Sequence, residues 1–446
     1  MDLGYSLLSQ FGGIEMRKVS CLLISVLLLL VMSGCSSERE LERTAFVLTM
    51  GIDKGEDGNL DVVFRVAIPR SMDIRAGGET TTLQETTKPI TITARSISEA
   101  ISLASTNVER KLDFRHLRIV LFGEELAREG LVFHQIDTLE RNPEFRRTTY
   151  MLLTEGPARE IFLSTRPVLE RSVSRYVDGI MQNMREQGYS RPITLHEFVS
   201  EIETYHVDPV LPMLKNNPMV LTEKSDSKIK PMPEAEYKQR EAGKTEPGGK
   251  TTESLTRSGG NPSEFIGIGI FHQGKLMDKW SGWEANAYNL LRDTYHRAIW
   301  TFDDPIGKYT YAVELSKSRS PEVNIHWQDE TPQISVDLYL DGDLLSLQSL
   351  EPYVNPDGLA TIENNAATII EKEVLQVIAK AQGMKIDPFF LSRYVRMHMT
   401  YIQDLQALNW REEFSRAQVN VHVNVKIRRP GLRIQPAKEF EYIGGQ

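Results

Sequence analysis

The sequence contains 446 residues, of which 40% are hydrophobic and 25% charged, and its net charge at pH 7 is −9. A chain of this length exceeds what one hydrophobic core usually organises, so we expect two or three domains. The acidic balance, without a block of basic residues, argues against a nucleic-acid-binding protein, because such proteins need clustered Lys and Arg to meet phosphate.

The first predicted element is an export signal. Arg17 and Lys18 precede a largely apolar run of 14 residues, Val19–Met32, and small residues follow. A basic segment, an apolar segment and a small-residue cleavage zone are the three parts of a secretory signal peptide. As a helix the apolar run would span about 21 Å, whereas the hydrocarbon core of a bilayer is about 30 Å thick. We therefore expect residues 1–34 to be a cleaved signal peptide, with translation starting at Met16.

The cysteine at the end of this signal indicates its type. An apolar residue, a small residue and Gly34 precede Cys35, a pattern that resembles the lipobox of bacterial lipoproteins. The resemblance implies cleavage between Gly34 and Cys35, a diacylglyceryl thioether on the Cys35 sulfur and an acyl chain such as palmitate on its amino group. Two or more buried acyl chains anchor a protein stably, since each CH2 group contributes about 0.8 kcal/mol. The alternative is an ordinary secreted protein in which Cys35 is incidental.

Cysteine usage limits the chemistry of the mature chain. The two cysteines of the sequence are Cys21, which leaves with the signal, and Cys35, which would carry lipid. The folded domains would then contain neither a thiol nor a disulfide, although export permits disulfides. This pattern excludes a thiol enzyme, an iron–sulfur site and a cysteine-ligated zinc site.

We interpret residues 36–165 as an N-terminal α+β domain. Two β-rich runs flank the turn sequence KGEDGN at 54–59 and predict a hairpin. Ser96 and Glu99 have the spacing of a capping box and predict the start of a helix. The further elements predicted here, in chain order, are a strand at 116–122, helices near 124–128 and 133–140, a strand at 148–156 and a helix that Pro157 opens. Strands interleaved with helices favour a mixed sheet covered by helices.

We interpret residues 166–312 as a middle domain. Helices are predicted over 168–184 and from Thr194, which has Glu197 at capping-box spacing. Residues 222–264 are rich in Lys, Glu, Ser, Thr, Gly and Pro and almost lack large apolar side chains. Such a segment cannot bury enough apolar surface to offset its ordering entropy, so we predict a flexible insertion. The run FIGIGIFHQGKLMDKW that follows predicts a hairpin with its turn at 272–274.

We interpret residues 313–446 as a C-terminal α+β domain. Strands are predicted at 323–327 and 334–340, and a long helix over Asp357–Gln382 carries one apolar stripe. Alternating Val and polar residues at 419–427 predict a strand with one face in the core and one in water. The inward residues predicted for the earlier strand are Ile334, Val336, Leu338 and Leu340.

Several short sequences resemble functional motifs, but none has the spacing that its chemistry needs. Gly249-Lys250-Thr251 follows Gly243 one residue too far on for a phosphate-binding loop, and no strand precedes it. The glycine-rich run from Gly267 has His272 where a dinucleotide fingerprint needs its third glycine. His196-Glu197 has Ser200 where a zinc-protease helix needs its second histidine.

These patterns predict no catalytic, cofactor-binding or metal-ligating residue. Two further histidines have structural interpretations. We expect His422 to be solvated on the polar face of the last strand, and His116 to pack as a partly buried residue at a helix–strand junction.

The ordered segments of the chain resemble one family, the Ger(x)C lipoproteins, which are the C subunits of bacterial spore germinant receptors. The residues that carry the resemblance are ERELERTAFVLTMGIDK, RKLDFRHLRIVLFGEELAREGL, LERNPEFRR, FIGIGIFHQGKLMDKW, Trp410, Phe414 and VNVHVNVKIRRPG. The resemblance implies a multi-domain α+β fold of mixed and antiparallel sheets flanked by helices.

The same resemblance implies a function. It indicates a non-enzymatic, lipid-anchored subunit on the outer face of the inner spore membrane, where it acts with integral membrane A and B subunits to trigger germination in response to nutrients. No cofactor and no nucleic-acid partner are expected. The alternative is a lipid-anchored solute-binding or envelope-processing lipoprotein.

Overall fold

The computed structural model describes residue 25 and residues 43–67, 87–217 and 260–433, apart from positions 168, 171, 308, 350, 352, 398 and 400. Gly34, Cys35 and nearly all of the predicted insertion at 222–264 lie outside the described residues. The described residues among 45–108 and 112–433 belong to one compact unit.

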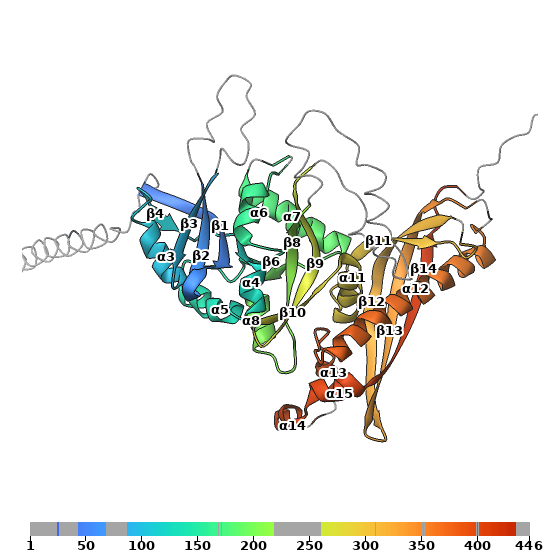
Figure 1. The fold of residues 1–446 in the computed structure, drawn as a ribbon. Helices are drawn as coiled ribbons and strands as arrows, with labels where there is room; N and C mark the ends of the chain where they lie inside the picture. The colour runs from blue at the N-terminus through green and yellow to red at the C-terminus, as the bar shows by residue number, and fades with distance from the viewer. Residues whose placement is uncertain are drawn as a thin grey trace, which may run out of the picture. The chain divides into compact units, whose positions relative to one another are not determined.

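Among the described residues, ten strands form one mixed sheet (Figure 1). They are β1 (Thr44–Lys54), β2 (Leu60–Ala67), β3 (Thr87–Ala94), β4 (Lys111–Asp113), β5 (Ile119–Phe122), β6 (Tyr150–Thr154), β7 (Ile193–Thr194), β8 (Val210–Asn216), β9 (Ser263–His272) and β10 (Lys275–Trp280). The main path is β10-β9-β8-β6-β5-β1-β2-β3. Its central strands β8, β6, β5 and β1 are parallel, and the strands on either side pair antiparallel.

Helices cover both faces of this sheet. They are α3 (Ile97–Ala104), α4 (Glu124–Arg128), α5 (Val132–Arg141), α6 (Ala158–Ser164), α7 (Val173–Gln187), α8 (Leu195–Ile202) and α11 (Gly282–Arg292), with a 3-10 turn, η2 (Glu56–Gly58), between β1 and β2. Apolar residues of α6 and α7 pack on one face, in a core separate from the one that α3, α5, α8 and α11 share on the other. A sheet buried on both faces explains why its central strands are almost continuously apolar.

Strand β5 contributes apolar side chains to both cores. Val120 and Phe122 belong to the core under α3 and α5, whereas Ile119 and Leu121 belong to the core under α6 and α7. Successive side chains of a strand point to opposite faces, so four apolar residues in a row fill two cores at once. Gly51 on neighbouring β1 lets α6 approach closely, because a Cβ there would lie 2.8 Å from the Phe162 ring.

A second sheet has four strands among the described residues, in the order β11-β12-β13-β14. The elements of this part are β11 (Arg297–Asp303), β12 (Thr310–Gln328), β13 (Thr331–Leu347), α12 (Pro356–Gly383), α13 (Ser392–Arg396), α14 (Ile402–Ala407), α15 (Trp410–Arg416) and β14 (Gln418–Arg429). Helix α12 runs along the sheet and contacts β14 (Figure 1). Most of the apolar stripe predicted for this helix is buried against the core, with Leu359 and Ile369 partly buried at its margin, and the four predicted inward residues of β13 are buried.

The predicted fold class, α+β with mixed sheets flanked by helices, is confirmed, and most predicted elements are present. Three boundaries were wrong. The strands predicted at 323–327 and 334–340 are parts of a much longer hairpin, Thr310–Gln328 and Thr331–Leu347. The missed inner part of β12 also alternates, with Tyr311, Val313 and Leu315 buried, and the exposed residues 317–320 interrupt the apolar pattern before residue 323. The helix predicted from residue 168 begins at Val173.

Two helix starts follow the predicted capping chemistry. The Thr194–Glu197 capping box at α8 is complete, with both reciprocal hydrogen bonds present. At α3 only half of it forms: Ser96 accepts from the Glu99 N–H, but the Glu99 carboxylate accepts from the Arg95 N–H instead. The predicted domain boundaries after residues 165 and 312 stay a prediction, and strands from both sides of residue 165 share the ten-stranded sheet.

Candidate functional site

The predicted functional residues and near-motifs fall in different places. The lipid-attachment and cleavage residues, Cys35 and Gly34, lie outside the described residues, as does Gly249-Lys250-Thr251. In the part of the chain that the structure describes, no helix is long and apolar enough to cross a membrane. The described residues also contain no group of three or more His, Cys, Asp and Glu placed to hold a metal ion.

The glycine-rich run from Gly267 forms the predicted hairpin, β9–β10. Gln273 and Gly274 at its tip have φ values of 49° and 85°, as a tight hairpin turn requires. Gly267 has a φ of 85°, and a Cβ there would lie 2.4 Å from the Trp280 carbonyl oxygen. The glycine therefore serves close strand packing, as predicted, and no helix follows the run to bind a dinucleotide.

Of the two predictions about histidine environments, one is confirmed and the other is wrong. His422 is exposed on the polar face of β14, as predicted, and its Nδ1 lies 3.3 Å from Glu371. His116 is also exposed, so its predicted partial burial was wrong. Its neighbour Leu117 takes the inward position before β5, which leaves the His116 ring at the surface, edge-on to Phe46 at 5.0 Å.

A buried group that sequence reasoning missed surrounds Asp208, between α8 and β8. Asp208 is 1% exposed, and its Oδ1 accepts from His272 Nδ1 at 2.7 Å and from Arg411 Nη2 at 3.0 Å. Its Oδ2 accepts from the backbone N–H of Asp387 at 2.7 Å. Asp387, in turn, accepts from Trp410 Nε1 at 2.7 Å. We call these five residues the Asp208 cluster; they connect β9 and the residues before β8 to the loop after α12 and to α15.

The pKa values of the two carboxylates of the Asp208 cluster are shifted in opposite directions. Burial alone would raise the pKa of Asp208, but the hydrogen bonds from His272 and Arg411 and the charge of Arg411 outweigh it and lower that pKa. Burial raises the pKa of Asp387, and the nearby Asp208 charge adds to the rise. Asp387 Oδ1 has no hydrogen-bond partner among the described residues. One carboxylate is thus held ionised, and the other is biased toward its neutral form.

A second buried group lies around Glu201 of α8. The Oε1 atom of Glu201 accepts from Arg191 and from Arg292, each at 2.9 Å, and Arg191 also donates to the Tyr288 hydroxyl at 3.0 Å. Burial would raise the pKa of Glu201, but the two guanidinium charges lower it. The Arg292 guanidinium also lies 5.0 Å from the centre of the Phe390 ring. These four charged and phenolic residues, the Glu201 cluster, join α8 and α11 to the residues before β7, and Arg292 also contacts Phe390 in the loop after α12.

In each cluster one carboxylate, Asp208 or Glu201, is paired with charged side chains inside the fold. Such an arrangement fixes the relative position of the segments that contribute to it, because separating them would leave charges buried without partners. The sequence carried one usable signal. Asp208 and Asp387 each stand between an aliphatic residue and a proline, in Val207-Asp208-Pro209 and Ile386-Asp387-Pro388. A lone acidic residue in such an apolar, rigid tripeptide indicates a buried carboxylate.

Known proteins of similar sequence and structure cover nearly the whole chain. The putative spore germination protein YfkR of Bacillus subtilis (strain 168) is 25% identical over 417 residues, 92% of this chain and 96% of that protein. Spore germination protein KC of the same strain is 22% identical and covers 94% of this chain and 98% of its own. The crystal structure of the GerBC protein matches with a TM-score of 0.51 at 18% identity, over 85% of this chain and 97% of that chain, and so shows the same fold.

The two sheets, with the helices packed on them and the buried charge clusters, define a multi-domain α+β protein. The model of the spore germination protein N-terminal domain matches residues 37–216, and that of the spore germination B3/GerAC-like C-terminal domain matches residues 266–431. The chain belongs to the Ger(x)C family of spore germination proteins.

Proposed function

We propose that this protein is the lipid-anchored C subunit of a nutrient germinant receptor and that it acts with integral membrane A and B subunits to trigger spore germination. One observation carries the proposal. Both family models of spore germination proteins match in order, over residues 37–216 and 266–431, so the resemblance extends across both sheets and is not confined to one motif.

The proposed anchor is a lipid on Cys35, which would follow cleavage after Gly34. A chain tethered in this way is confined to the membrane plane, where its effective concentration near membrane partners exceeds that of a free protein. The proposed location is the outer face of the inner spore membrane. The mature chain contributes recognition and positioning and performs no chemistry of its own. The carboxylates of Asp208 and Glu201 support a non-enzymatic role, because they accept hydrogen bonds from charged side chains and backbone within the fold.

The test replaces the lipid-bearing thiol. Cys35→Ala should shift the protein from the membrane fraction of spores to the soluble fraction and abolish germination through its receptor. Cys21→Ala is the matched control, since Cys21 lies within the predicted signal and leaves with it. Normal germination by spores whose Cys35→Ala protein is soluble would refute the tethering mechanism.

The proposed partners require a separate measurement. Wild-type protein, isolated from spore membranes in mild detergent after crosslinking, should bring two integral membrane proteins with it in reproducible ratio. Isolation of the anchored protein with no membrane partner would contradict the receptor role while leaving the lipid anchor intact.

A further inference from the structure

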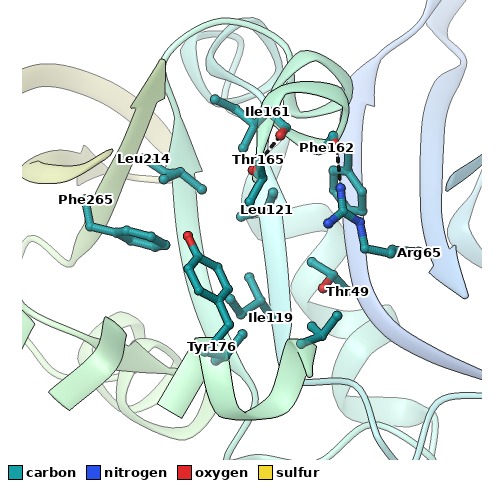
Figure 2. Close-up of a pocket in the computed structure, with 12 residues that line it drawn as sticks. Thr49, Arg65, Ile119, Leu121, Ile161, Phe162, Thr165, Tyr176, Leu214 and Phe265 are labelled. Carbon is teal, nitrogen blue, oxygen red and sulfur yellow. Dashed lines mark hydrogen bonds between the residues drawn. The ribbon is translucent and has the colours of Figure 1, made fainter. Parts of the chain in front are cut away.

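A small cavity lies between helices α6 and α7 and the face of the ten-stranded sheet that they cover (Figure 2). Its volume is about 40 Å³. A cavity must offer about 10–15 Å³ to hold one water molecule, so this cavity has room for about three groups of that size. Most of its wall is apolar and includes Ile119 and Leu121 from β5, Val177 from α7 and Phe265 from β9.

The charged group of this cavity is Arg65 on β2. Its neighbours Phe64 and Val66 point into the opposite core, so strand alternation directs Arg65 to the α6–α7 face, which is also apolar. Arg65 is only 6% exposed. One Nη atom donates to the Phe162 carbonyl oxygen, and the guanidinium carbon lies 5.1 Å from the centre of the Phe162 ring (Figure 2). Its Nε has no hydrogen-bond partner among the described residues.

The Arg65 charge also lacks an anion. Among the described residues, no carboxylate pairs with it, and Tyr176 is the group whose charge would act on it. Burial raises the pKa of Tyr176, which keeps that hydroxyl neutral and unable to balance a cation. Burial lowers the pKa of Arg65 to about 10, as expected of a cation in apolar surroundings. Buried charges in proteins are ordinarily paired, and a carbonyl and a ring face compensate a guanidinium only in part.

We propose that this cavity binds a small carboxylate with a short alkyl chain, of about the size of propionate. The carboxylate would accept from the Arg65 guanidinium, including its unpartnered Nε–H, and the chain would lie against Ile119, Leu121 and Val177. A planar carboxylate matches the guanidinium fork, and its single charge balances the single cation. A larger or doubly charged anion would leave charge desolvated against an apolar wall.

The experiment follows thermal unfolding of the full-length chain, purified in detergent, in the presence of sodium acetate, propionate or butyrate. Propionamide tests the need for charge, and sodium chloride at equal ionic strength tests for a general salt effect. The melting temperature should rise with carboxylate concentration and then saturate, as binding to the folded state requires, and should not respond in this way to the amide or to chloride.

Two variants and one control locate the binding. Arg65→Gln should weaken the apparent affinity roughly tenfold to a hundredfold, which corresponds to the loss of a charge-assisted hydrogen bond. Arg118→Gln is the matched control: Arg118 lies just before β5, but it already pairs with Asp178 of α7, so its loss should leave the carboxylate response unchanged. Val177→Leu narrows the cavity and should remove the response to butyrate before that to acetate.

Three results would overturn the proposal. They are a wild-type melting temperature that no carboxylate raises above the chloride control, an equal rise in Arg65→Gln, and an unchanged preference among the three acids in Val177→Leu. The last result decides the question alone if Arg65→Gln does not fold. Because none of these measurements depends on Cys35 or on membrane partners, their failure is separable from failure of the receptor role.

Discussion

The Asp208 cluster and the Arg65 cavity bury charge in opposite ways. Asp208 is 1% exposed and has a histidine, an arginine and a backbone N–H as donors. Arg65 is 6% exposed and has one carbonyl acceptor, one aromatic ring and no carboxylate partner among the described residues. The exposed fractions of the two side chains are nearly the same, so burial alone does not distinguish a charge that stabilises the fold from one that binds a ligand.

The hydrogen-bond and ion-pair partners of each charged group make that distinction. A charge whose hydrogen bonds are all internal stabilises the fold, and its removal should be costly. A charge left without its counter-ion weakens the fold slightly and is free to interact with something that the fold does not supply. The predictions below test whether this division holds, beginning with the largest expected effect.

Asp208→Asn should destabilise the protein by about 3–5 kcal/mol, because the amide would place an NH2 group against donors and leave Arg411 without its carboxylate. The measurement is the urea midpoint followed by tryptophan fluorescence. Asp329→Asn, in the exposed turn of the β12–β13 hairpin, makes the same charge change where Asn tolerates the φ of 47° equally well, and should alter stability by less than about 0.5 kcal/mol. Equal effects of the two variants would show that the Asp208 cluster is not structural.

The same variant should change the response to acid. Because the folded state holds the pKa of Asp208 below its ordinary value of 3.8, the stability that this group contributes is present above pH 3.8. It is lost as the pH falls through the lower, folded-state pKa, where the folded protein also takes up the proton. Asp208→Asn lacks this component, so its stability should fall less steeply than that of the wild type below pH 4.

Arg191→Met should cost about 2–4 kcal/mol, somewhat less than the loss of Asp208. It removes one of two guanidinium partners of Glu201, while Arg292 remains and the Met side chain fills part of the space. Glu203→Gln, at the exposed end of the same helix, controls for a charge change near α8 and should stay within about 0.5 kcal/mol. A near-neutral Arg191→Met would mean that the Glu201 cluster contributes nothing that packing cannot replace.

The sequence predicted helices and strands far better than it predicted the partners of the buried charges. Apolar alternation located the inward face of β13, and capping-box spacing located the start of α8, because both depend on residues close together in the chain. The Asp208 cluster depends on residues up to 203 positions apart, from Asp208 to Arg411, and no local spacing encodes such a contact.

Arg65 was within reach of sequence reasoning. It is a single charge in the run Val62–Ala67, which is otherwise apolar at every position and therefore buried on both faces. A charge in a strand of this kind has no solvated face to occupy. The sequence does not show whether a carboxylate from elsewhere in the fold pairs with Arg65.

Asp387→Asn separates the two carboxylates of the Asp208 cluster. The folded state raises the pKa of Asp387, so the stability associated with its protonated form is present at low pH and is lost as the pH rises from 3.8 through the raised pKa. An amide oxygen can still accept from Trp410 and from the Ser392 N–H, as Asp387 Oδ2 does. At neutral pH the variant should therefore be as stable as the wild type, or about 1 kcal/mol more stable. A loss as large as that of Asp208→Asn would show that both acids act as paired charges.

The smallest effect is expected for Arg65→Met, and it tests the division most directly. Methionine removes a cation that no described carboxylate balances, and it fills the apolar space that the arginine stem occupied. The relief of the buried charge should nearly offset the lost hydrogen bond to Phe162, so the urea midpoint should shift by less than about 1 kcal/mol in either direction. A loss comparable to that of Arg191→Met would place Arg65 among the structural charges. In that event its interactions with Phe162 suffice for the fold, and the cavity beside it needs no anion.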